Sequence, residues 1–246
     1  MDETHLSLMI RNRIQKYGEK PALRYVEKGH WKDISWHAMG EQIRAVAKGL
    51  LAMDVKPGDM VAIFSQNRPE WTIADYGILT VRGVSVPVYA TDTAKQAEYI
   101  VNDAETGIIF VGTQEQYDKV KTHAGASPHL RKIIAFDSDV RLNGSNTDMY
   151  FRDFLDLGRK SDIDVEVEKR LSSASIDDLA TVIYTSGTTG EPKGVMLHHS
   201  TFYHCFIANK KRLEVSDRDV SLCFLPLSHI FERAWCYFAS DNGMVI

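Results

Sequence analysis

Short apolar runs separated by helix-like segments constrain the fold of this chain more than any other feature. The runs are Met60–Phe64, Val84–Val88, Ile108–Val111 and Lys132–Phe136. Continuous apolar runs of this length are typical of strands that are buried on both faces of a parallel sheet. Because helices of ordinary length fit between the runs, the pattern predicts an α/β fold of layered parallel or mixed sheets, with helices on both faces.

Turn and capping signals place further elements around these runs. Residues 22–26 and 31–34 alternate across a glycine, which predicts a hairpin. Ser35 is predicted to cap the helix that follows, and the capping-box spacing of residues 93–96 predicts the start of another helix. Residues 137–178 are highly charged, and we expect there a surface excursion containing one short helix.

The composition excludes several classes of protein. A net charge of −4 argues against a nucleic-acid-binding module, which normally carries a basic excess on one face. No run approaches the ~20 apolar residues of a membrane-spanning helix, and the start of the chain lacks a signal-peptide pattern, so we expect a cytoplasmic protein with no transmembrane segment. Cys205, Cys223 and Cys236 show no C-x-x-C spacing and are expected to be buried, reduced thiols.

The most informative segment is a predicted strand, Leu179–Tyr184, that leads into the loop Thr185-Ser-Gly-Thr-Thr-Gly-Glu-Pro-Lys-Gly194. Glycines allow close backbone approach, exposed N–H groups form an anion-binding nest, and hydroxyls add rotatable donors. Lys193 adds a mobile positive charge. The segment therefore predicts a phosphate-binding loop, although a flexible turn between strands is the alternative. The nucleoside-triphosphatase loop is excluded, because Lys193 precedes Gly194 and no Gly-Lys-Ser/Thr triplet occurs in the segment.

This loop closely resembles the signature of the adenylate-forming superfamily, which contains acyl-CoA synthetases, luciferases and peptide-synthetase adenylation domains. Residues 225–233, Leu-Pro-Leu-Ser-His-Ile-Phe-Glu-Arg, resemble the block that follows the phosphate loop in long-chain fatty acid CoA ligases. Residues 65–71 and 83–89 are similar to early sheet motifs of the same family. The resemblance implies that residues 1–246 are the N-terminal portion of the large AMP-binding domain, without its C-terminal part and without the small C-terminal domain.

The resemblance also implies roles for individual residues. Thr185 is expected to lie nearest the nucleotide and its Mg²⁺, and Lys193 and His229 are the expected catalytic residues. The expected phosphate cradle consists of Thr185, Ser186, Gly187, Thr188, Thr189, Gly190 and Lys193. ATP, Mg²⁺ and coenzyme A are the implied cofactors, and a fatty acid is the implied substrate.

The surroundings of His229 carry further expectations. A strand is predicted at residues 220–225, which would place His229 beside the carboxyl end of a strand. Glu232 and Arg233 are expected to form an ion pair without catalytic duty. An aromatic stripe, Phe231, Trp235 and Phe238, suits an acyl tunnel and core packing equally well. Upstream, Ser200 is expected to cap a helix, and His198 and His199 are not expected to bind a metal because no third ligand has a suitable spacing.

The predicted function is ATP-dependent activation of a long-chain fatty acid through an acyl-adenylate, followed by transfer to coenzyme A. Residues 241–246 resemble an interrupted strand, so the chain is expected to be a fragment that is inactive alone. A stand-alone nucleotide-binding module and a ligase for another carboxylic acid are the alternatives. The partners expected are small molecules, and the alternative of a peripheral membrane contact applies to the longer parent protein.

Overall fold

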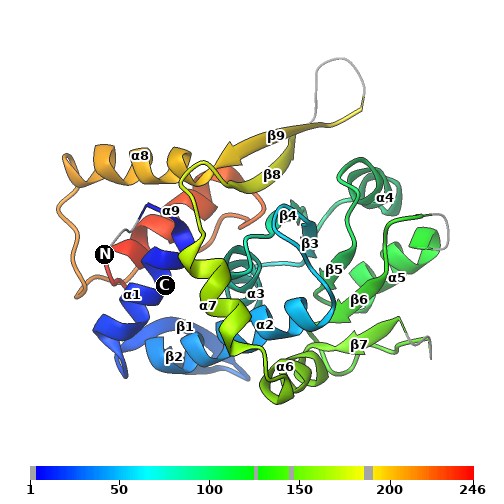
Figure 1. Ribbon diagram of the computed structural model, residues 1–246, viewed down its shortest axis with the longest axis horizontal. Coiled ribbons are helices and arrows are strands. Elements are labelled where there is room, and N and C mark those ends of the chain that lie inside the picture. Colours follow the sequence, from blue (N-terminus) through cyan, green and yellow to red (C-terminus); the bar gives the residue numbers. More distant parts are fainter. Residues whose placement is uncertain (1–3, 125–126, 144–146, 186–190) are drawn as a thin grey trace.

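The computed structural model describes residues 4–124, 127–143, 147–185 and 191–246. Its main feature is a seven-stranded sheet in which every neighbouring pair is parallel except the last (Figure 1). The spatial order is β7 (Asp148–Tyr150), β6 (Lys132–Ala135), β5 (Ile108–Val111), β3 (Met60–Phe64), β4 (Val84–Val88), β8 (Leu179–Thr185) and β9 (Lys193–His198). The predicted α/β fold and the strands predicted from the four short apolar runs are confirmed.

The two faces of the sheet contribute to two separate hydrophobic cores. Along β3, Val61 and Ile63 belong to one core, whereas Ala62 and Phe64 belong to the other. This division follows from strand geometry, because successive side chains point to opposite faces. Helices α4 (Ala94–Asp103) and α5 (Gln114–Ala124) cover one face, and α2 (Trp36–Ala52) and α3 (Pro69–Thr80) lie against the other (Figure 1). The continuous apolar runs of the sequence are therefore explained by burial on both faces.

The capping signals in the first half of the chain are confirmed. β1 (Pro21–Glu27) and β2 (His30–Ser35) form the predicted antiparallel hairpin. Ser35 caps α2 by accepting a hydrogen bond from the Ala38 N–H, at 3.1 Å. Thr93, the N-cap of α4, and Gln96 in its first turn form the predicted capping box.

One helix at the start of the described chain has no counterpart in the sequence predictions. Helix α1 (Leu6–Tyr17) packs against α2 and buries Met9 and Ile10. His5 lies immediately before it, and its ring stacks on His199 with a centroid separation of 3.4 Å. His199 also accepts a hydrogen bond from the Leu6 N–H, at 3.1 Å. Helix α1 is thus fixed to a segment almost 200 residues away.

The prediction for residues 137–178 is right about the presence of a helix but wrong about the number of elements and their burial. Instead of a surface excursion with one short helix, the described part contains β7 and two helices, α6 (Phe151–Lys160) and α7 (Asp164–Ser172). Helix α6 is amphipathic and directs Phe151, Phe154 and Leu155 into the core, and the Phe154 side chain is fully buried. Its apolar positions recur with the helical period, but the surrounding charges obscured that pattern.

A close crossing of α6 with α2 depends on Gly158. A Cβ atom at this position would lie 1.9 Å from the carbonyl oxygen of Ala45 and 3.0 Å from the amide nitrogen of Gly49. Both neighbours are backbone atoms of α2, which cannot rotate away. The absence of a side chain at Gly158 is therefore what allows the two helices to approach.

Three further local predictions are wrong. Helix α8 (His199–Lys210) begins directly after His198, so Ser200 is inside the helix and is not its cap. Residues 220–225 are extended but do not form a strand, since only Val220 makes a β-bridge, to Val245. Residues 241–246 comprise the end of α9 (Ile230–Asp241) and a short extension in which Ile246 hydrogen-bonds to β1, so they are not a strand of the main sheet.

Every helix within the described residues is too short or too polar to span a lipid bilayer.

Candidate functional site

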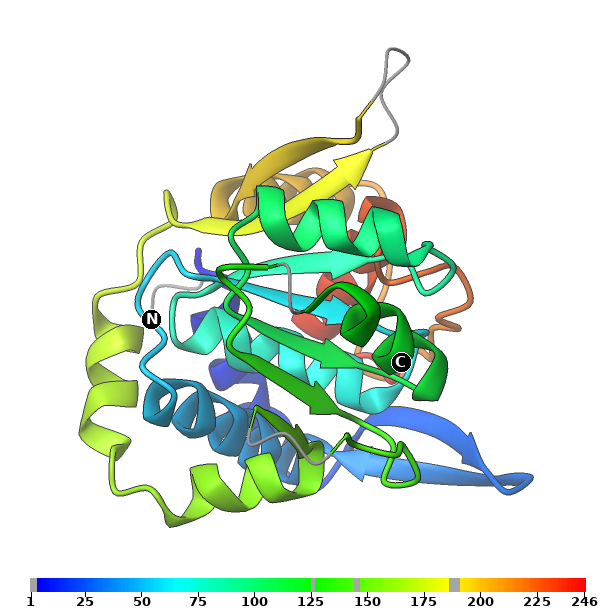
Figure 2. The same cartoon turned by 90° about the vertical axis from the view of Figure 1, so that its right-hand side faces the viewer.

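The predicted phosphate loop connects the two strands of a hairpin at the edge of the main sheet. Strands β8 and β9 are antiparallel, and Thr185 is the partner of Lys193 in their register. Both side chains are exposed. The hairpin extends beyond the other strands in two perpendicular views (Figures 1 and 2). The pairing thus brings the predicted magnesium-binding hydroxyl and the predicted catalytic ammonium group to the two sides of one loop.

The interior of the loop lies outside the described residues. Of the predicted cradle, Ser186, Gly187, Thr188, Thr189 and Gly190 fall in this gap. Among the carboxylates that the structure describes, none forms an ion pair with Lys193. The charge of Lys193 is therefore not neutralised by the described part of the protein.

The strand that enters the loop is anchored on its inner side by Tyr184. This side chain is buried, and its hydroxyl donates a 2.6 Å hydrogen bond to the carboxylate of Asp103, the last residue of α4. Burial and the adjacent carboxylate raise the pKa of Tyr184 above its ordinary value, so the hydroxyl remains a donor. Thr185 follows at the exposed end of the same strand.

His229 is the N-cap of α9. Its ring nitrogen Nδ1 accepts a hydrogen bond from the Phe231 N–H at 3.2 Å, and the ring itself is exposed. The cap occupies Nδ1, and none of the hydrogen bonds within the described residues involves Nε2. The predicted position after a strand is wrong, because residues 220–225 do not form one; a tight turn before α9, closed by the His229 N–H and the Pro226 carbonyl at 2.9 Å, positions the ring instead.

Asn67 holds the segment before His229, a role that was not predicted from the sequence. Its Nδ2 donates to the Leu225 carbonyl at 2.7 Å, while its Oδ1 accepts from the Leu227 N–H at 2.9 Å. Asn67 follows the carboxyl end of β3, where polar residues of a parallel sheet commonly meet ligands or loops. It therefore joins two motifs that are about 160 residues apart.

Arg233 forms an ion pair with Asp75, so the predicted pairing of Glu232 with Arg233 is wrong. Arg233 and Asp75 are both 1% exposed. The guanidinium also donates to the hydroxyl of Thr181 at 2.6 Å and to that of Tyr237 at 2.9 Å. Thr181 is in β8, four residues before the loop begins. This buried network consequently fixes α9 against both α3 and the strand that carries Thr185.

The exposure of individual side chains tests two further expectations, the aromatic stripe on α9 and the buried cysteines. Phe238 is in the core, Trp235 is half-buried, and Phe231 is 63% exposed, so the aromatic stripe does not act as one unit. Of the cysteines, only Cys236 is buried; Cys205 and Cys223 are half-buried, so the expectation of three buried thiols is wrong for two of them.

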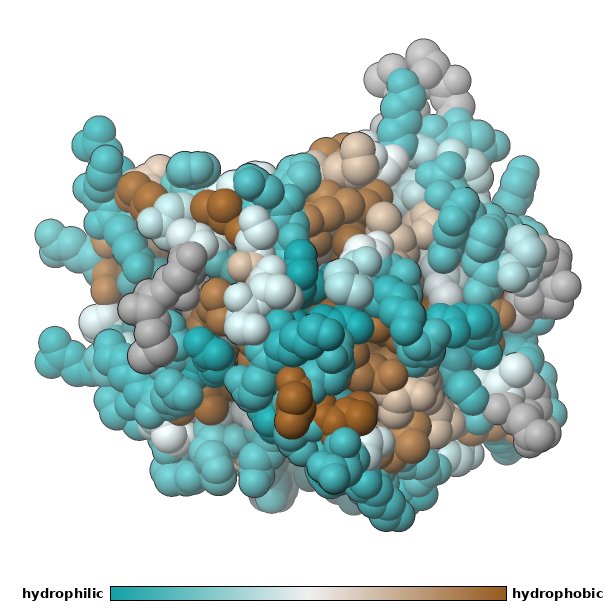
Figure 3. Space-filling view, viewed as in Figure 1, coloured by the Kyte–Doolittle hydropathy of each residue, from teal (hydrophilic) through white to brown (hydrophobic). Residues whose placement is uncertain are grey.

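A cavity of about 850 Å³ lies apart from the loop. Its lining includes Asn67, Leu222 and Cys223, together with β1 and β2, but neither Thr185 nor Lys193. The space-filling view shows hydrophilic residues over most of the face, with apolar patches between them (Figure 3). The cavity is therefore not the predicted phosphate site.

Comparison with known proteins establishes the class to which this fold and loop belong. Residues 10–246 match the family described as "AMP-binding enzyme". The chain belongs to that family, and the resemblance noted from its sequence motifs is confirmed.

Individual relatives add detail. The chain is 32% identical over 228 residues to long-chain-fatty-acid–CoA ligase ACSBG2 of Xenopus laevis, which covers 90% of the chain and 30% of the relative. It is 36% identical over 210 residues to long-chain-fatty-acid–CoA ligase FadD15 of Mycobacterium tuberculosis, covering 84% of the chain and 33% of that protein. The chain thus spans about a third of the length of these curated relatives.

Solved structures share the fold. The anthranilate CoA ligase AuaEII, crystallised with anthranoyl-AMP, superposes with a TM-score of 0.86 at 19% identity, over 98% of this chain and 44% of that one. The N-terminal domain of FACL13 from Mycobacterium tuberculosis superposes with a TM-score of 0.77 at 22% identity, over 98% of this chain and 57% of that one. At these identities the likeness concerns the fold alone.

Proposed function

We propose that this chain supplies the phosphate-binding part of an enzyme that activates a carboxylic acid, specifically a long-chain fatty acid, with ATP and transfers it to coenzyme A. The observation that carries the proposal is the pairing of Thr185 with Lys193 at the open end of the β8–β9 hairpin. Family membership supports the adenylate chemistry, and the names of the curated relatives support the fatty acid.

In this reaction a carboxylate oxygen attacks the α-phosphorus of ATP, and pyrophosphate leaves. The thiol of coenzyme A then attacks the acyl carbon, and AMP leaves. Both reactants of the first step are anions, so the protein's main task is to offset negative charge. Lys193 suits this task because its ammonium group is exposed and pairs with no described carboxylate. Its role is to bind the β- and γ-phosphates and to stabilise departing pyrophosphate.

Thr185 and His229 have supporting roles in this proposal. Thr185 offers one neutral, exposed oxygen, which fits Mg²⁺ as a single protein ligand beside phosphate oxygens and water. Bound Mg²⁺ would supply further charge neutralisation. His229 keeps Nε2 available while Nδ1 caps α9, so the ring is held in a defined orientation. We assign Nε2 to a hydrogen bond with the acyl carboxylate or the α-phosphate.

The test is ATP–pyrophosphate exchange with palmitate in the native protein that carries this segment. Lys193→Ala and Thr185→Val are expected to lower the exchange rate, for Lys193 by about 10²-fold or more, as for other losses of a transition-state charge partner. Their thermal midpoints should stay close to that of the wild type, because both side chains are exposed. Lys211→Ala, which removes an exposed lysine after α8, is the matched control. Equal exchange in all four proteins would contradict the assigned roles.

The choice of acid is tested separately in the same assay. A series of acids of increasing chain length, with benzoate and an amino acid added, should give the highest exchange with the long-chain members. Higher exchange with an aromatic or amino acid would retain the adenylate chemistry but overturn the fatty acid. Saturable Mg·ATP binding without exchange for any acid would instead indicate a nucleotide-binding module.

A further inference from the structure

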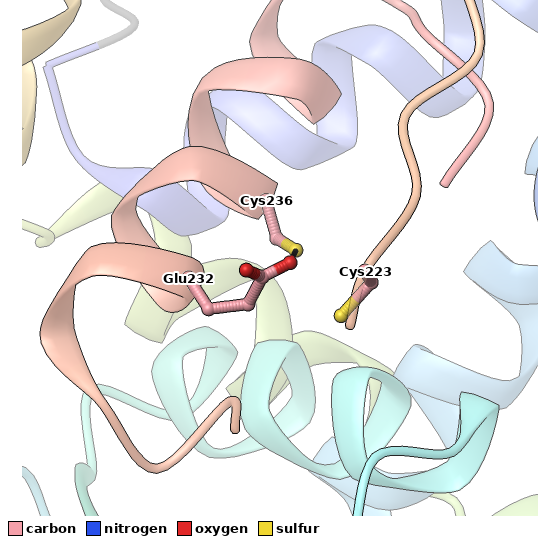
Figure 4. A group of neighbouring side chains, drawn as sticks. All are labelled: Cys223, Glu232 and Cys236. Carbon is pink, nitrogen blue, oxygen red and sulfur yellow. Dashed lines mark hydrogen bonds between the residues drawn. The ribbon is translucent and has the colours of Figure 1, made fainter. Parts of the chain in front are cut away.

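Three potential metal ligands converge beside α9, away from the phosphate loop. Cys223 comes from the extended segment 220–225, while Glu232 and Cys236 lie one turn apart on α9 (Figure 4). One ligand atom from each residue lies within 4.8 Å of both others. The Cys236 thiol donates to the Glu232 carboxylate at 3.9 Å. Two sulfur atoms and one carboxylate therefore point toward a common centre.

The burial of Glu232 indicates that this cluster favours a cation. The residue is only 2% exposed. Among the described residues, no lysine, arginine or histidine forms an ion pair with it, and the neighbouring Arg233 pairs with Asp75 instead. The one hydrogen bond that its carboxylate receives from the described residues comes from a thiol, which is a weak donor. A buried carboxylate without a cation is costly, because burial removes the hydration of its charge.

The donor set selects the kind of cation. Thiolate ligands favour zinc and similar thiophilic ions over Mg²⁺ or Ca²⁺. Zn–S distances of about 2.3 Å and Zn–O distances of about 2.0–2.2 Å place tetrahedral ligand atoms roughly 3.3–3.8 Å apart. The cluster would need to contract by about 1 Å to meet these separations. Cys223 can make this movement because it lies on an extended segment and not within a helix.

The surroundings of Cys223 provide access and support. Cys223 borders the cavity of about 850 Å³, which offers an entry path and room for a water ligand. The Asn67 amide donates to its sulfur at 3.3 Å, an outer contact that favours the thiolate.

We propose that Cys223, Glu232 and Cys236 bind one Zn²⁺ ion, with water as the fourth ligand. Binding releases the two thiol protons to solvent and involves no oxidation or reduction. Because Cys223 and Cys236 lie on either side of His229 in the sequence, the ion would fasten the 220–225 segment to α9 and fix the turn that carries His229. The role is structural, and it does not depend on which acid the enzyme activates.

The test uses the reduced 246-residue chain under anaerobic conditions, with Co²⁺ as a spectroscopic probe and Zn²⁺ as competitor. We expect one equivalent of Co²⁺ to produce a thiolate-to-cobalt charge-transfer band that Zn²⁺ abolishes. Cys236→Ser and Cys223→Ser should eliminate the band, and Glu232→Gln should weaken Co²⁺ binding by at least about 10-fold. Cys205→Ser is the matched control, since Cys205 is outside the cluster, and it should bind as the wild type does.

Two results would overturn the proposal. One is the absence of a charge-transfer band in the reduced wild type. The other is equal binding by the wild type and Cys223→Ser. Cys223 is half-buried, so its serine variant should fold even if Cys236→Ser does not. A circular dichroism spectrum of each variant verifies folding before titration.

Discussion

The buried ion pair between Arg233 and Asp75 should contribute more to the integrity of the site than any exposed pair in the protein. Replacing Arg233 with methionine keeps an unbranched side chain but removes the charge. The change deletes hydrogen bonds to Asp75, Thr181 and Tyr237, and leaves the Asp75 carboxylate buried at 1% exposure without its cation. Loss of one partner from such a pair costs about 3–5 kcal/mol of unfolding free energy.

This loss is a large share of the about 5–15 kcal/mol that stabilises a typical domain. The matched double variant, Asp75→Asn with Arg233→Met, removes both charges and should recover at least about 1.5 kcal/mol relative to the single variant, because no uncompensated charge remains buried. The surface control is Arg24→Met. Arg24 and Asp33 are 39% and 38% exposed, and this pair should contribute less than about 1 kcal/mol.

Urea-induced unfolding followed by tryptophan fluorescence measures these differences. Trp71 is a suitable reporter, because it is buried and its ring lies 5.3 Å from the Arg233 guanidinium. Should Arg233→Met prove too unstable to fold, the double variant and Arg233→Lys still yield transitions that can be compared. An Arg233→Met protein as stable as Arg24→Met, or a double variant less stable than the single one, would refute the reasoning.

Two further predictions concern other contacts between distant elements. Burial, followed by the charge of His5, lowers the pKa of His199 well below the ordinary value of histidine. The unfolded chain therefore binds the proton more readily below pH ~6.5, and stability should fall there by up to about 1.4 kcal/mol per pH unit. Urea unfolding at several pH values measures how steeply the free energy of unfolding falls as the pH is lowered. This fall should be less steep for His199→Asn, whereas the exposed-site control His204→Asn should keep the wild-type dependence. The same pH dependence in both variants would count against the burial argument. For the helix crossing, Gly158→Ala should lower the unfolding free energy by about 1–3 kcal/mol, because its Cβ would collide with the α2 backbone. Gly40→Ala, whose Cβ meets only the Ile14 side chain, should cost less, and the reverse order in urea unfolding would contradict this account.

The local elements of the fold were predictable where a single signal dominated. The strand Met60–Phe64 is apolar at every position, and Ser35 has the residue type and place of an N-cap. One short helix was expected in residues 137–178, but the burial of α6 was not predicted, because charged residues outnumber its apolar face, although that face follows the helical period. The extended segment 220–225 was overpredicted, because β-propensity alone cannot show whether a pairing partner is present.

The sequence motif names the residues of the candidate site, but the long-range contacts that hold the surrounding elements in place could not be predicted. The motif identified Thr185 and Lys193, and the hairpin register places them opposite each other. In contrast, the partners Arg233 and Asp75 are 158 residues apart, and Asn67 reaches a segment at a similar separation. Contacts of this kind depend on the packing of α9 against the sheet, and no local pattern in the sequence records that packing.

The central claim is that the end of the β8–β9 hairpin receives the phosphates of ATP. The most direct measurement is a titration of the 246-residue chain with Mg·ATP, followed by the backbone amide signals of residues 185–194. We expect saturable shifts confined to this segment and its neighbours, and much weaker binding by Lys193→Ala than by Lys211→Ala. Unchanged signals at saturating Mg·ATP, or equal affinity in the two lysine variants, would contradict the claim.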